Sequence, residues 1–101
     1  MAKDTSLLFR LRNAVEELAT GQGDVRSRLK DIYLYLQPIQ NSDLPKKLQK
    51  DWSHLMDQFT KHTGEFYGEN SLDTSLRKIK NSTGQKMAKI IYKVWRHIEK
   101  N

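Results

Sequence analysis

The stretch QKMAKIIYKVWRHIEK, residues 85–100, carries two regular patterns at once. Its apolar residues recur every three or four positions, which is the spacing of one face of an α-helix. They are Met87, Ile90, Ile91, Val94, Trp95 and Ile98. A second set at the same spacing is cationic and comprises Lys86, Lys89, Lys93, Arg96 and Lys100. At about 100° per residue the cations point within roughly 80° of one another, and about 145° away from the apolar face. The stretch predicts a helix that buries one side and presents a row of positive charge on the other.

Immediately before this helix, the sequence Asn81-Ser82-Thr83-Gly84-Gln85 has two interpretations. Ser82 could cap a new helix with Gln85 completing a capping box, or the segment could be a kink inside one long helix. We favour the break. It would separate the last helix from a short one over residues 72–80, which Ser71 is placed to cap.

The rest of the chain also has helical rather than strand spacing, interrupted by two prolines and five glycines. We therefore expect an all-α fold, a bundle of four or five helices, and one domain over residues 1–101. The expected helices cover residues 5–20, 25–37, 44–62, 72–80 and 83–100. Their expected caps are Asp4 or Thr5, Asp24, and Ser42 or Asp43 followed by Pro45 in the first turn.

Each expected helix has an apolar stripe that predicts its buried face. The four stripes before the last helix are Leu7, Leu8, Leu11, Val15 and Leu18; Val25, Leu29, Ile32 and Leu36; Leu44, Leu48, Trp52, Leu55, Met56 and Phe59; and Leu72, Leu76 and Ile79. Trp52 is the expected anchor of the core, and the loop that follows the third helix should fold Phe66 and Tyr67 back onto it.

Composition limits the class of protein. The chain has 101 residues and no cysteine, so disulfides, thiolate nucleophiles and Cys-based zinc sites are excluded. The first ten residues lack the apolar core of a signal peptide, and no apolar run approaches the roughly 18 residues that cross a bilayer. We expect a soluble cytoplasmic protein that does not use a membrane.

The net charge of +6 lies entirely in the C-terminal part of the chain. Residues 1–71 hold ten Lys and Arg against ten Asp and Glu, whereas residues 72–101 hold eight against two. Arg77, Lys78 and Lys80 extend the cationic row of the last helix upstream. One interpretation is a phosphate-contacting strip for nucleic acid, and the other is a solvated lysine-rich face that keeps the protein soluble.

A narrower hypothesis concerns Ser82, Thr83 and Gly84. At a helix N-terminus they would offer free amides and hydroxyls to an anion beside neighbouring lysines, although ordinary capping explains them as well. The spacing of a phosphate-binding loop is missing, so nucleotide hydrolysis does not follow.

No catalytic constellation emerges from the sequence. His54 and His62 would be about 12 Å apart along one helix, too far to share a metal ion. The serines do not occupy a nucleophile elbow. We therefore expect no enzyme activity, no metal and no cofactor.

Aromatic residues are the remaining candidates for contact with a partner, namely Phe9, Tyr33, Tyr35, Phe66, Tyr67, Tyr92 and Trp95. Tyr35 and Tyr92 lie off the apolar faces of their helices and should be exposed or at a subunit contact, whereas Trp95 at the edge of its stripe should belong to the core. The expected function is therefore that of a small binding or regulatory protein that acts through protein–protein contacts. The alternative is a nucleic-acid-associated protein that binds phosphates through its basic C-terminal helix. The sequence does not define an oligomeric state.

Three segments resemble a group of small bacterial proteins to which no activity is attached. They are AVEELATG at residues 14–21, GDVR at residues 23–26, and RKIKNSTG at residues 77–84 before a helix with Tyr and Trp. The resemblance covers most of the chain. It implies a compact helical protein and transfers no functional residue.

Overall fold

The computed structural model describes residues 5–62, 68 and 70–100, and these form five α-helices, one turn of 3-10 helix and no strand. The all-α expectation is confirmed. The helices are α1 (Thr5–Thr20), α2 (Val25–Leu36), α3 (Lys46–Phe59), α4 (Ser71–Lys78) and α5 (Asn81–Lys100), with the 3-10 turn at Asn41–Asp43. Asp4, the side chain of Thr5, Phe66 and Tyr67 lie outside this description.

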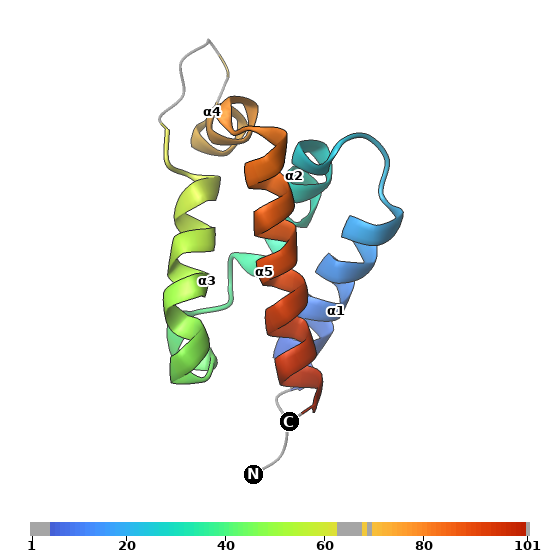
Figure 1. Cartoon of the computed structure of the whole chain (residues 1–101), viewed down its shortest axis with the longest axis vertical. Coiled ribbons are helices and arrows are strands. Elements are labelled where there is room, and N and C mark those ends of the chain that lie inside the picture. The colour runs from blue at the N-terminus through green and yellow to red at the C-terminus, as the bar shows by residue number, and fades with distance from the viewer. Residues whose placement is uncertain (1–4, 63–67, 69, 101) are drawn as a thin grey trace.

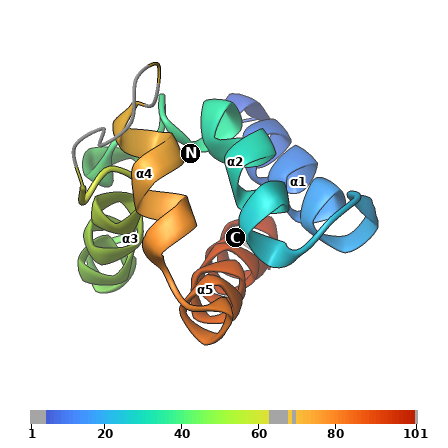
Figure 2. The same ribbon diagram turned by 90° about the horizontal axis from the view of Figure 1, so that it is seen from above.

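The helices surround one apolar cluster to which all five contribute. Helices α1 and α2 form an antiparallel pair, α3 lies on the other side of α5, and α4 lies across the beginning of α5 (Figures 1 and 2). In Figure 1 the viewer looks onto α5, which has α1 on one side and α3 on the other. This arrangement leaves the face of α5 opposite the core uncovered.

The connection between α1 and α2 has the cap residue that the sequence predicted. Gly23 has a φ of 83°, a conformation that side chains with a Cβ adopt only at a cost in energy. Asp24 then caps α2 as predicted, because its carboxylate accepts the amides of Arg26 and Ser27 at 2.9 and 3.1 Å. The Ser27 amide and the Arg26 guanidinium lower the pKa of the Asp24 carboxyl. Helix α2 ends at Leu36, one residue before the expected end.

The predicted bounds of the third helix are wrong at both ends. It begins at Lys46 rather than at residue 44, because Asn41–Asp43 form a separate 3-10 turn and Pro45 precedes the helix with a ψ of 145°. Asp43 stabilises that 3-10 turn, because its carboxylate accepts a hydrogen bond from the Gln40 amide at 2.9 Å. Neither it nor Ser42 is the cap residue of α3.

At its other end, α3 stops at Phe59 rather than at residue 62. In a continued helix the amide of His62 would donate to the carbonyl of Gln58. Instead it donates to the hydroxyl of Ser75 on α4 at 2.8 Å, and that hydroxyl is fully buried. The hydrogen bond to α4 therefore takes the place of the hydrogen bond that would continue α3 to residue 62.

The break before the last helix is confirmed, and its position is corrected. Helix α4 is capped by Asn70, whose side chain accepts the Asp73 amide at 2.8 Å, so Ser71 is the first helical residue and not the cap. The chain becomes extended at Ile79 with a ψ of 151°. Helix α5 then starts at Asn81, because the Lys80 carbonyl accepts the Gly84 amide at 3.0 Å. Ser82 therefore lies inside the first turn.

The predicted stripes account for most of the core. All four predicted residues of α2 are buried, and Trp52 is 1% exposed with its indole N–H donating to the carbonyl of Ile39 at 3.4 Å. Several predicted positions are only half-buried, namely Leu8, Val15, Leu18, Met56, Leu72, Ile79, Ile90 and Trp95. The stripes missed Ala14, Ile39 and the two buried polar residues Thr74 and Ser75.

Candidate functional site

The candidate site is the outer face of α5, positioned by the burial of the inner face. Residues Gly84, Met87, Ile91, Val94 and Ile98 are buried at intervals of three, four, three and four. Because this spacing follows one side of a helix, it fixes the rotation of α5 and directs the opposite side outward. Figure 2 shows α5 at the edge of the arrangement, beside both α1 and α3.

The whole cationic row predicted on this helix is exposed. Its members are Lys86, Lys89, Lys93, Arg96 and Lys100. At about 1.5 Å per residue the row runs for about 21 Å, from Lys86 to Lys100, along a helix that is about 30 Å long. The structure thus brings these five predicted site residues together as one surface, which we call the α5 cationic face.

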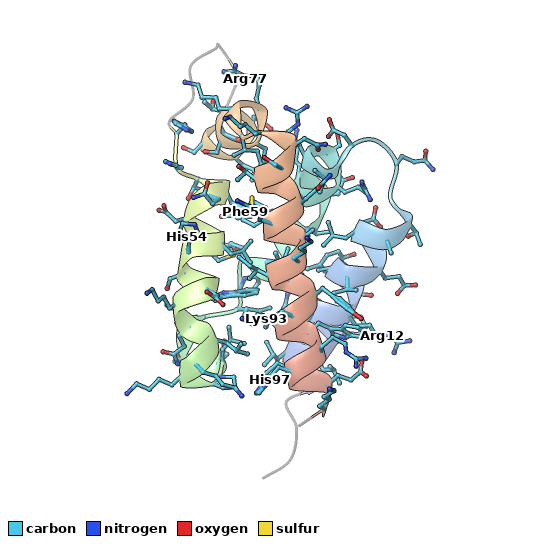
Figure 3. The ribbon with its side chains drawn as sticks, viewed as in Figure 1. Arg12, His54, Phe59, Arg77, Lys93 and His97 are labelled. Carbon is cyan, nitrogen blue, oxygen red and sulfur yellow. The ribbon has the colours of Figure 1, made fainter. Side chains whose placement is uncertain are left out.

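One member of this face has an acidic neighbour that the sequence did not reveal. The ammonium of Lys93 lies 3.0 Å from the Asp51 carboxylate of α3, and the two side chains are 61% and 43% exposed. An ion pair this exposed contributes about 0–1 kcal/mol, so a phosphate can compete for Lys93. Figure 3 shows Lys93 on the side of α5 that faces α3.

The three upstream cations are exposed at the end of the molecule where α4 crosses α5. Arg77 and Lys78 belong to the last turn of α4, and Lys80 lies in the connection to α5. Figure 3 shows Arg77 at this end, far from His97 near the other end of α5. These three cations therefore lie near the beginning of α5 and outside the α5 cationic face.

In the segment Ser82, Thr83 and Gly84, only Gly84 is unable to offer its amide to an anion, because Ser82 and Thr83 lie in the first turn of α5, where backbone amides have no partner within the helix. The amide of Gly84 is already bonded to the Lys80 carbonyl, and Gly84 itself is buried. An added Cβ there would lie 2.8 Å from Cγ1 of Val25, which shows how closely α5 approaches α2. Gly84 is therefore a packing residue.

A cleft lies between α3 and the beginning of α5. It has a volume of about 340 Å³ and is lined by His54, Leu55, Gln58, Thr83, Lys86, Met87 and Ile90. His54 is exposed on α3, and His62 is held by its backbone against α4. Among the residues described, no group of three or more His, Cys, Asp or Glu is placed to hold a metal ion.

Among the residues that the structure describes, four large apolar or aromatic side chains are exposed: Phe9, Leu34, Tyr35 and Tyr92. The exposure predicted for Tyr35 and Tyr92 is confirmed, at 38% and 44%. Tyr92 contacts the half-buried Trp95 edge to face, with ring centroids 5.7 Å apart and an interplanar angle of 72°. The exposure of Leu34 was not predicted from the sequence.

No family model, curated protein or solved structure matches this chain. Within the part that the structure describes, none of the helices is both long enough and apolar enough to cross a membrane.

Proposed function

We propose that this protein binds nucleic acid, and that the α5 cationic face contacts the phosphate backbone. The observation that carries the proposal is the exposure of all five cations of the row along one helix. Phosphate contacts by Lys and Arg release condensed counterions and give affinity with little sequence preference. Arg77, Lys78 and Lys80 would enlarge the contact at one end.

The placement of negative charge supports this function. Lys93 is paired with Asp51, whereas α5 itself holds a single acidic residue, Glu99, in its last turn. Because few acidic side chains offset the five cations, the α5 cationic face produces a positive electrostatic potential that attracts a polyanion. The protein would act by binding rather than by catalysis.

The proposal is tested by titrating labelled duplex DNA and single-stranded RNA with the protein at several salt concentrations. If four or five phosphates are engaged, log K for the duplex should fall with log[salt] at a slope of about −4. Lys89→Glu combined with Arg96→Glu should weaken binding at low salt by about tenfold or more and make the slope shallower. Lys93 is left unchanged in this variant because its substitution would also break the ion pair with Asp51.

The matched control is Lys46→Glu with Lys61→Glu, which changes the net charge equally at two exposed positions outside α5. It should reduce the affinity much less. Absence of binding at low salt, or equal losses in the two double variants, would contradict the proposed function.

A second candidate function is contact with another protein, favoured by the exposed apolar residues of the α1–α2 pair. Phe9 is 65% exposed and Leu34 is 76% exposed. Both lie at the same end of the pair, because the first turns of α1 and the segment after α2 line one pocket that includes Leu7 and Ile39. Burial of such side chains contributes about 1.5–3 kcal/mol each.

Self-association is the direct test of this second function. If these side chains mediate contact between copies of the chain, the sedimentation coefficient should rise with protein concentration, and Leu34→Glu should abolish the rise because it would bury a charge. Thr20→Glu, at an exposed position at the far end of α1, is the control. A sedimentation coefficient that is independent of concentration would exclude self-association through this surface.

A further inference from the structure

Tyr92 occupies a distinctive place beside the α5 cationic face. Lys89 precedes it by three residues and Arg96 follows it by four, so the two cations lie one helical turn away in each direction on the same side of α5. All three side chains are exposed. An aromatic ring is thus bracketed by two cations along the axis of the helix.

The ring of Tyr92 is also held in place. Its contact with Trp95, at a centroid distance of 5.7 Å and an angle of 72°, is the edge-to-face geometry that aromatic pairs prefer. Trp95 in turn packs against the core. Because Tyr92 keeps 44% of its surface exposed despite this contact, a restrained aromatic surface remains open to solvent.

On the basis of the proposed function, we infer that the preferred ligand is single-stranded nucleic acid, one base of which stacks on Tyr92 while neighbouring phosphates contact Lys89 and Arg96. In a duplex the faces of the bases are covered by their neighbours, and only base edges and phosphates are accessible. In a single strand the faces are free. Proteins that bind single strands combine a cationic track with aromatic platforms in this way.

The consequence is a division of roles between charge and stacking. The cations attract either form of nucleic acid and determine the dependence on salt, whereas Tyr92 discriminates between the two forms. Because every base has a π-face, this discrimination requires no particular sequence.

The test compares a labelled oligo(dT), which cannot pair with itself, with a duplex of the same length. The unmodified protein should bind the single strand about tenfold or more tightly than the duplex. Tyr92→Leu retains apolar bulk but lacks a π-face, and it should weaken oligo(dT) binding by about tenfold while leaving duplex binding and the salt slope unchanged. Tyr92→Phe retains the platform and should bind oligo(dT) as the unmodified protein does.

The outcomes separate the two levels of inference. Binding to neither nucleic acid would overturn the proposed function and the stacking role together. Binding to both with equal affinity, unchanged by Tyr92→Leu, would overturn the stacking role and leave phosphate binding intact. If circular dichroism shows that Tyr92→Leu is unfolded, the binding of oligo(dT) and of the duplex to the unmodified protein still tests the stacking role. A preference of the unmodified protein for the duplex would contradict it.

Discussion

Replacing Trp52 by alanine is expected to destabilise the fold by about 3–5 kcal/mol, because a large buried aromatic side chain would leave a cavity that its neighbours fill only in part. Trp52 is 1% exposed, and its indole N–H donates to the carbonyl of Ile39. The loss would be a large fraction of the 5–15 kcal/mol that stabilises a typical domain. Urea denaturation followed by far-UV circular dichroism measures it.

Two controls identify the source of this effect. Trp52→Phe keeps most of the apolar volume and loses the hydrogen bond to the carbonyl of Ile39, so it should cost about 1–3 kcal/mol. Tyr35→Ala removes an aromatic ring that is 38% exposed and should cost less than Trp52→Ala. A loss below about 1 kcal/mol for Trp52→Ala would show that this residue is not the anchor of the core.

Gly84→Val is expected to destabilise the protein by about 1–3 kcal/mol through overpacking between α5 and α2. A Cβ at this position would lie 2.8 Å from Cγ1 of Val25, and Val25 cannot move aside easily because its β-branched side chain is stiff. Gly84→Ala should also destabilise the protein, although alanine is favoured over glycine within a helix by about 1 kcal/mol. Thermal or urea denaturation provides the measurement.

A double-mutant cycle tests whether Val25 is the obstacle. In a chain that carries Val25→Ala, the space opposite Gly84 is free, and Gly84→Ala should become neutral or stabilising by up to about 1 kcal/mol. Ser82→Ala in the same helical turn is exposed and should change stability by less than about 0.5 kcal/mol in either background. Additive effects of Val25→Ala and Gly84→Ala would contradict a direct contact.

The sequence predicted the buried faces well because burial follows from periodicity within one helix. In α2 the spacing of Val25, Leu29, Ile32 and Leu36 determines which side faces the core, and all four are buried. The exposure of the cationic row on α5 follows from the same logic, since burying one side of a helix exposes the other.

Helix ends were predicted less well, because they depend on partners from other parts of the chain. The amide of His62, just after α3, donates to the buried hydroxyl of Ser75 on α4. No local sequence pattern predicts this contact between distant segments. Likewise, the proximity of Lys93 and Asp51 depends on the relative positions of α3 and α5. Burial of Thr74 and Ser75 could not be predicted from apolar spacing because both are polar.

The position of α5 has a consequence for the order of events in folding. This helix contacts α1, α2 and α3, yet it follows all three in the chain, so its contacts with α1 close a loop that contains the rest of the fold. Because closing a long loop costs chain entropy, we expect these contacts to form later than those between α1 and α2, which are adjacent in the chain. Docking of α5 buries its apolar face and directs the five cations outward, so we expect the α5 cationic face to take its position in the same step that completes the core.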